Sequence, residues 1–322
     1  MPSTFGSTTM PKVNSGELQG RGFELSIVYN KRFACGLGLT ARATLSKIRE
    51  KITKYNNPNK NIYGNYEGKI IGEIWGYETD RLFQYEDCYQ DADGKWFIDT
   101  NKVPSQALYE TGAFKYGPGY VKYKDLDGNG EITYGEHTLE DHGDLKRFGN
   151  TLPNFEYGFS VALTYKDFDF STFFQGIGSR DVWAVGQTGI PGFMPGEGWL
   201  EHQMDYWTPE NTDAFYPTPT SHSWINNGQN FLRQTRYLQN MSYLRCKNIT
   251  LGYTVPEKWM KVITFTSGRI YVSAENLFEF DHTNIPVDPE TTEKAAASNG
   301  EYKFGKSYPF MRSISFGVQL TF

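Results

Sequence analysis

The residues from 125 to 136, DLDGNGEITYGE, have the types and the spacing of a calcium-binding loop. Calcium takes six to eight hard oxygen ligands, and the twelve-position EF-hand loop curls them around one point. The candidate ligands are Asp125, Asp127, Asn129, the carbonyl group of Glu131 and the carboxylate of Glu136. Gly130 stands at the sixth position, where such a loop turns sharply, and Ile132 stands at the apolar eighth. The spacing predicts a bound Ca²⁺.

The flanks of this loop decide what a calcium ion would do there. The segments GYVKYK before it and HTLEDHGD after it do not form a pair of amphipathic helices that a sensor would open and close. We therefore expect a structural clamp that stiffens a loop. An Asx-rich turn of the same shape without an ion and a regulatory switch are the alternatives. His137 and His142 are better interpreted as solvated loop residues than as metal ligands.

Tryptophans mark a second candidate site. Trp183, Trp199, Trp207 and Trp224 all lie between residues 181 and 224, in a stretch rich in Gly and Pro. Aromatic faces stack on sugar rings and anchor protein interfaces, so this loop is a candidate for contact with a ligand or a partner. The alternative is that these side chains form a small core of the loop itself.

Several function classes find no support in the residues. The sequence lacks GxSxG, HExxH and phosphate-loop motifs, so we do not expect an enzyme. The net charge is only −5 and Lys and Arg are dispersed, so the sequence shows no basic patch of the kind that binds nucleic acid. The three cysteines are isolated and imply neither a disulfide framework nor a zinc site.

The composition favours strands. The 322 residues include 22 Tyr, 23 Phe and 33 Gly, which suits many strands and turns. No run of about 18 apolar residues is present, which excludes a membrane-spanning helix but not a membrane barrel, whose strands alternate.

Seven segments alternate between large apolar residues and small or polar ones, with the period of a β-strand. They are residues 21–30, 35–46, 155–165, 168–175, 249–253, 269–275 and 313–322. Long connections fall at about 48–154, 177–243 and 278–309, whereas the others are short. Long loops on one side and short turns on the other are typical of an outer-membrane barrel.

Two further expectations concern the rest of the chain. Within 48–154 we expect extra strands at 69–84 and 118–126, above the membrane. Alternation alone also fits a soluble, secreted β-sandwich that binds carbohydrate and holds a structural calcium.

Six stretches together resemble the C-terminal portion of the SusC/RagA-type TonB-dependent outer-membrane transporters. They are GKIIGEIWGYETDRLFQ, PGYVKYKDLDGNGEI, FGNTLPNFEYGFSVALTYKDFDFSTFFQGIGSRD, YLRCKNITLGYTVPEKW, RIYVSAENLFEF and SISFGVQLTF. The resemblance runs from about residue 12 to residue 322. It implies an all-β fold, the C-terminal part of an antiparallel transmembrane barrel of about 22 strands.

The resemblance also implies a function and partners. Such a transporter imports glycan fragments or peptides across the outer membrane of a Bacteroidetes-like bacterium. It works with a SusD-like surface lipoprotein and with the TonB complex, which acts on a plug domain. Residues 1–322 show no counterpart of the plug or the earlier strands, so we expect a fragment with two unpaired sheet edges.

The final strand carries a signal of its own in this family. A last strand that ends in an aromatic residue resembles the mark by which barrel-assembly machinery recognises its clients. The residues concerned are Phe316, Val318, Leu320 and Phe322. The alternative is that Phe322 is one more lipid-facing aromatic residue.

Overall fold

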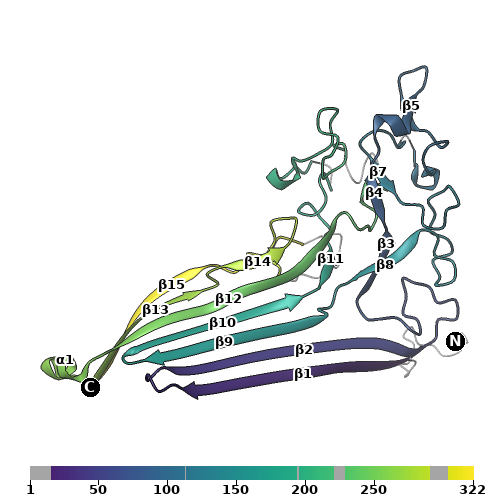
Figure 1. Ribbon diagram of the computed structural model, residues 1–322. Helices are drawn as coiled ribbons and strands as arrows, with labels where there is room; N and C mark the ends of the chain where they lie inside the picture. Colours follow the sequence, from purple (N-terminus) through teal and green to yellow (C-terminus); the bar gives the residue numbers. More distant parts are fainter. Residues whose placement is uncertain (1–15, 113, 194–195, 221–228, 291–303) are drawn as a thin grey trace, which may run out of the picture.

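One broad antiparallel sheet dominates the computed structural model of this chain, which describes residues 16–112, 114–193, 196–220, 229–290 and 304–322 (Figure 1). Across these residues seven strands follow one another in the order β1, β2, β9, β10, β12, β13 and β15. Their bounds are Gly16–Arg32 (β1), Gly38–Tyr55 (β2), Phe155–Tyr165 (β9), Phe168–Gly178 (β10), Leu238–Val255 (β12), Ser267–Glu275 (β13) and Ser313–Thr321 (β15). The seven predicted strands and the all-β, antiparallel class are confirmed.

The two-residue rhythm of the sequence determines which side chains share a face of this sheet. In the hairpin of β9 and β10, Tyr165 lies opposite Phe168, so Lys166 and Asp167 form the whole turn. Lys166 has a φ of 52°, the left-handed conformation that tight hairpin turns use at their first central position. Most large apolar residues of both strands therefore stand on one face and most small or polar residues on the other; Phe173 and Ile177 are exceptions, opposite Ser160 and Glu156.

Short connections gather at one end of the sheet. Figure 1 places the β1–β2 turn, the β9–β10 turn, the helix α1 (Glu257–Met260) and the C-terminus at this end. The segments that join β2 to β9 and β10 to β12 rise from the opposite end. The asymmetry predicted from the connection lengths is present in the structure.

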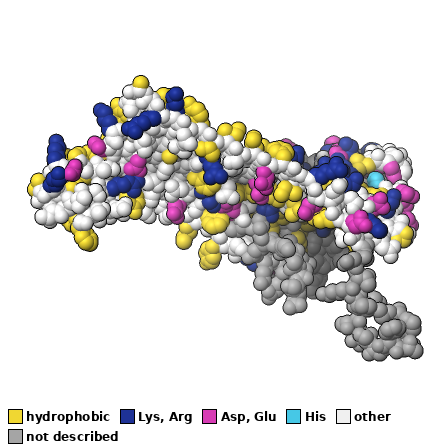
Figure 2. Space-filling model, turned by 90° about the horizontal axis from the view of Figure 1, so that it is seen from below, with side chains coloured by type: hydrophobic (Ala, Val, Ile, Leu, Met, Phe, Trp, Pro, Cys, Tyr) yellow, Lys and Arg dark blue, Asp and Glu magenta, His cyan; other side chains and the backbone are white. Residues whose placement is uncertain are grey.

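Large apolar side chains remain exposed on the sheet. Phe23, Leu25 and Ile27 of β1 are 53%, 48% and 55% exposed, and Phe316 of β15 is 84% exposed. Figure 2 shows hydrophobic side chains standing at the surface on the side seen from below. A β-sandwich would cover one such face with a second sheet, so the sandwich alternative does not describe this arrangement. Within the described residues, no helix has the length and the hydrophobicity to cross a membrane.

The long connections fold into a second unit beyond one end of the sheet (Figure 1). It contains the pairs β3 (Glu73–Tyr77) with β8 (Leu145–Asn150), β4 (Thr79–Leu82) with β7 (Val121–Tyr123), and β5 (Cys88–Gln90) with β6 (Trp96–Ile98). Short 3-10 turns occur at Tyr85–Asp87, Ala107–Tyr109, Glu201–Gln203, Gln229–Phe231 and, beside α1, Lys261–Ile263. β3, β4 and β7 are the extra strands predicted at 69–84 and 118–126. Because β2 continues to Tyr55, the region predicted at 48–154 begins inside that strand.

The second unit has one aromatic-rich core built from two separate connections. Its buried residues come from positions 62 to 145 and from positions 190 to 237. The backbone N–H of Tyr77 donates to the carbonyl of Arg233 at 2.8 Å, and Thr79 Oγ1 donates to Gln234 Oε1 at 2.6 Å. The two connections therefore fold as a single body.

β12 changes face halfway along its length. Phe173 of β10 lies opposite Asn248, whereas Phe174 lies opposite Cys246, so one extra residue is inserted in β12. Such a β-bulge reverses the alternation of the strand beyond it. It places Arg245 opposite Gln175, on the polar face, instead of on the face of Ile249.

Two short strands pair with the part of β12 above this bulge. They are β11 (Asp181–Trp183) and β14 (Glu279–His282).

Candidate functional site

The predicted calcium loop is held by side-chain to backbone hydrogen bonds. The carboxylate of Asp125 accepts from the backbone N–H groups of Gly128 at 2.7 Å and Gly130 at 2.8 Å. Asp127 accepts from the N–H of Asn129 at 3.0 Å, and Asn129 Oδ1 accepts from the N–H of Glu131 at 2.7 Å. These bonds are those of an Asx-rich turn, which an ion-bound loop also contains.

Ile132 fixes this loop to the core of the second unit. Its side chain is only 1% exposed and belongs to the buried cluster. Its backbone N–H donates to the carbonyl of Ser105 at 2.8 Å, and the N–H of Ser105 donates to the carbonyl of Gly130 at the same distance. The apolar eighth position therefore anchors the loop, as its place in the motif suggests.

A third carboxylate joins Asp125 and Asp127, and it belongs to Asp144. Ligand oxygens of these three residues all lie within 4.8 Å of one another. Glu136, which the motif places at the twelfth position, is not in this group. The reason is the course of the chain, because the N–H of Asp144 donates to the carbonyl of Thr133 at 3.0 Å and residues 134–143 form a separate loop between them, which bonds to Lys60 and Ile62.

Asp144 is a buried carboxylate, 0% exposed, that accepts two backbone hydrogen bonds. Its oxygens accept from the N–H groups of Leu126 at 2.6 Å and Thr133 at 2.7 Å. Burial raises the pKa of Asp144, and the carboxylates of Asp127 and Asp125 raise it further against these two bonds. Three clustered carboxylates of like charge are a donor set that fits a hard cation such as Ca²⁺.

The tryptophans occupy different environments. Trp207 is 5% exposed and belongs to the buried cluster, and its ring lies 5.5 Å from that of Tyr85. Trp183 is half-buried and packs against the same cluster. Trp199 is half-buried beside Tyr206, with their ring centroids 5.4 Å apart. Trp224 lies outside the described residues. The burial of Trp207 agrees with the alternative that these tryptophans form a core of the loop itself.

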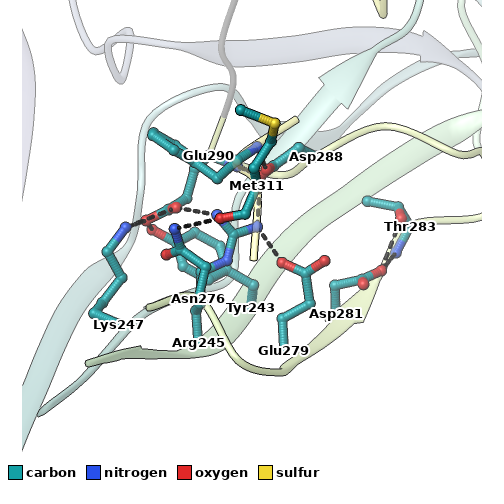
Figure 3. A network of polar contacts seen from close by, with 11 residues as sticks. Tyr243, Arg245, Lys247, Asn276, Glu279, Asp281, Thr283, Asp288, Glu290 and Met311 are labelled. Atoms are coloured by element: carbon teal, nitrogen blue, oxygen red, sulfur yellow. Dashed lines mark hydrogen bonds and ion pairs between the residues drawn. The ribbon is translucent and has the colours of Figure 1, made fainter. Parts of the chain in front are cut away.

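A buried charge network, which the sequence did not reveal, surrounds Arg245 (Figure 3). Arg245 is 2% exposed, and Nη2 lies 2.7 Å from Asp288 Oδ1. The same guanidinium also pairs with Glu279 and Glu290. Lys247 Nζ lies 3.0 Å from Glu290 Oε2. The network fastens the segment after β14 to the polar face of β12.

Two aromatic residues, Tyr243 and Phe310, also contact this network. The hydroxyl of Tyr243 donates to Glu290 Oε1 at 2.8 Å. The ring of Phe310 lies under Lys247 Nζ, 4.7 Å from its centroid, and the backbone N–H of Phe310 donates to Asp288 Oδ2 at 2.8 Å. The partners of Arg245 lie 34 to 45 residues away in the sequence, so spacing could not reveal them. In the sequence, the charged residue Arg245 within a strand is the sign that could have pointed to this network.

The terminal strand is exposed along its whole apolar row. Phe316, Val318 and Leu320 are 84%, 68% and 45% exposed, and Phe322 is 97% exposed. Within the described residues β15 pairs with β13 on one edge and has no partner on the other. These residues are thus placed for contact with lipid or with another strand.

Comparisons with known proteins give relatives of one kind. No family model matches the chain. It is 27% identical to TonB-dependent receptor P3 of Formosa agariphila and 23% identical to TonB-dependent receptor SusC of Bacteroides thetaiotaomicron. Each match covers 96% of this chain, but only 29% and 27% of the relative. The chain therefore spans less than a third of these relatives.

A solved structure shares the fold. The structure of the RagAB peptide transporter matches with a TM-score of 0.64 at 19% identity, over 100% of this chain and 31% of that one. The predicted resemblance to this family and its partial-barrel fold are confirmed.

Proposed function

Because this chain is a homologue of the TonB-dependent receptors that include SusC, we propose that it forms part of an outer-membrane nutrient importer. The observation that carries this proposal is the exposed apolar face of an open antiparallel sheet, on strands of about membrane-spanning length. Soluble monomers rarely expose such contiguous apolar surface. Lipid would cover the face of Phe23, Leu25 and Ile27, and the polar face would line the lumen.

The proposal assigns the two ends of the sheet to two sides of the membrane. The end with the short turns and α1 would face the periplasm, and the second unit would stand outside the cell. The substrate would be glycan fragments or peptides. A SusD-like lipoprotein would bind at the outer surface, and the TonB complex would act through a plug domain that belongs to the longer protein.

We also propose roles for three local features. Asp125, Asp127 and Asp144 would hold a structural Ca²⁺ with Asn129 and the carbonyl of Glu131. Trp183 and Trp199 are the candidates for contact with substrate or lipoprotein, whereas the burial of Trp207 assigns it to the core. The row that ends in Phe322 would be recognised by the barrel-assembly machinery.

Fractionation tests the main proposal. The whole transporter that contains this chain should sediment with the outer membrane and require detergent for extraction. Cells that lack it should lose uptake of at least one oligosaccharide or peptide, and the intact gene should restore that uptake. Recovery of the protein as a compact monomer in aqueous buffer would overturn the proposal.

A further inference from the structure

A hollow of about 670 Å³ opens in the main sheet, where β2 separates from β9. The last β2–β9 pair is Ser46 with Glu156, and the next contact on this side of β2 is the bridge between Lys51 and Ile70. Between these points the carbonyl of Glu50 accepts a hydrogen bond from the N–H of Ile71 at 3.1 Å, and residues 47–49 of β2 have no strand partner on this side within the described chain. The volume lies within the roughly 300–1,000 Å³ that ligand pockets occupy.

Asn150 fixes one wall of the hollow. Its Nδ2 donates to the carbonyl of Ile71 at 2.9 Å, and its Oδ1 accepts from the N–H of Leu152 at 2.7 Å. Its own N–H donates to Asp181 Oδ2 at 3.2 Å. β8, the segment before β3 and the start of β11 are thereby tied together, so this wall is formed before any ligand arrives.

Three acidic side chains that line the hollow have no ion-pair partner within the described residues, whereas a fourth, Glu73, pairs with Arg147. Asp181 is half-buried, and no ion pair within the described residues neutralises it. Burial raises the pKa of Asp181, although the hydrogen bond from Asn150 opposes this. Glu50 and Glu156 also line the hollow and have no ion-pair partner in the described chain.

Cationic side chains line the same hollow. Arg147 lies in β8 and contacts Glu73 through Nη1 at 3.3 Å, while its side chain stays 47% exposed. Lys47 and Arg49 contribute from β2 and form no ion pair within the described part of the chain. The hollow therefore presents both signs of charge, with donors and acceptors left to satisfy.

These charges select the class of ligand. A neutral oligosaccharide would bury part of the acidic and basic groups without neutralising them, which costs desolvation energy. A short peptide carries an ammonium and a carboxylate group, and its backbone can pair with the interrupted edge of β2 by strand addition. We propose that this hollow is a peptide subsite in which Asp181 receives the ammonium group and Arg147 or Arg49 receives the carboxylate.

This inference rests on the importer function proposed above and adds the substrate class to it. The test uses the whole transporter, purified in detergent, and isothermal titration calorimetry with three probes. These are trialanine, trialanine acetylated and amidated at its ends, and maltotriose. We expect trialanine to bind and the two uncharged probes to bind at least roughly tenfold more weakly, because they lack the charged groups that hydrogen-bond to the carboxylate and guanidinium groups of the hollow.

Variants locate the binding. Asp181→Asn and, independently, Arg49→Gln should each weaken trialanine binding by roughly tenfold or more. Asp213→Asn is the matched control, because it removes one negative charge from an exposed residue outside the hollow. Each variant must melt at the temperature of the parent protein, and Glu156→Gln replaces any variant that does not.

Different outcomes overturn different claims. Equal trialanine affinity in the Asp181 and Arg49 variants, or equal affinity for the blocked peptide, would overturn the peptide subsite. An outer-membrane protein that imports an oligosaccharide but does not bind trialanine would leave the importer intact and remove this subsite. Recovery from the aqueous phase would overturn both.

Discussion

At the scale of single residues, Asp144 is a carboxylate that the twelve-position motif does not include and that lies beside Asp125 and Asp127. The first positions of the loop lie as the EF-hand spacing expects, with Asp125 and Asp127 side by side. The twelfth position does not, because residues 134–143 form a separate loop and Asp144 returns beside Thr133. A positive φ at Gly135 and at His137 accompanies this excursion. The spacing of the sequence therefore pointed to Asp125 and Asp127 but could not show that Asp144 lies beside them.

We expect Asp144, and not Glu136, to control calcium affinity. Asp144→Asn should weaken binding by roughly a hundredfold or more, since even outer-shell partners of a metal contribute 10–100-fold. Glu136→Gln should leave the affinity nearly unchanged. Calorimetry of the whole transporter with Ca²⁺ makes the comparison. A large loss in Glu136→Gln with none in Asp144→Asn would reverse the assignment, and no heat in the parent protein would favour the ion-free turn.

Arg245 illustrates a buried charge whose loss is expected to be costly. Its replacement by Met would remove the ion pair with the buried Asp288, and one ion pair each from Glu290 and the partly exposed Glu279. Breaking one side of a buried ion pair typically costs about 3–5 kcal/mol. Arg245→Met should therefore lower the free energy of unfolding in detergent by about this amount and expose residues 283–290 to protease.

Lys247→Met is the control for Arg245, because the Lys247 side chain is more exposed, at 23%, and within the described residues it forms an ion pair with one carboxylate, that of Glu290. We expect it to cost about 1 kcal/mol or less. Equal stability of the parent protein and Arg245→Met would show that the network does not hold this segment in place.

At the scale of elements, alternation predicted the strands wherever it is uninterrupted. β9 matches its predicted segment because every second residue is large and apolar, and β10 begins at the predicted residue but continues three residues beyond the predicted end, to Gly178. The upper half of β12 was missed, since the bulge at Lys247 reverses the alternation: Arg245 is in phase with Ile249 in the sequence but lies on the polar face of the strand. The β5–β6 hairpin was missed because strands of three residues are too short to show a period.

The last strand allows a test of assembly. Deleting Phe322 from the whole transporter should reduce its amount in the outer membrane severalfold, because the terminal aromatic residue is proposed to be the recognised feature. Trp259→Ala is the control, since Trp259 is an aromatic residue 59% exposed at the same end of the molecule but outside β15. Immunoblots of membrane fractions give the measurement. Normal assembly without Phe322 would leave it as an ordinary exposed aromatic residue.

At the scale of the whole molecule, the main sheet is open at both edges. Within the described residues β1 pairs only with β2, and β15 only with β13. Unpaired edges with exposed apolar side chains are templates for association with other strands. The family resemblance predicted these edges, whereas the joint core of the second unit depends on contacts between segments more than 100 residues apart, which no local pattern shows.

The 322-residue chain produced by itself should therefore self-associate. We expect light scattering in detergent to show oligomers, and Leu25→Lys with Ile27→Lys to reduce them, because charged side chains discourage strand pairing at an edge. The whole transporter should remain discrete under the same conditions. A monodisperse monomer of the 322-residue chain would contradict this prediction.

The shared core of the second unit also limits how such a protein can diversify. Trp207 from one connection and Phe83, Tyr116 and Tyr123 from the other are buried in the same cluster. A graft of either connection alone from a homologue would leave mismatched surfaces inside the cluster. Recombination between relatives should therefore preserve the two connections as a linked pair, and engineers who wish to exchange specificity would have to transplant both as one cassette.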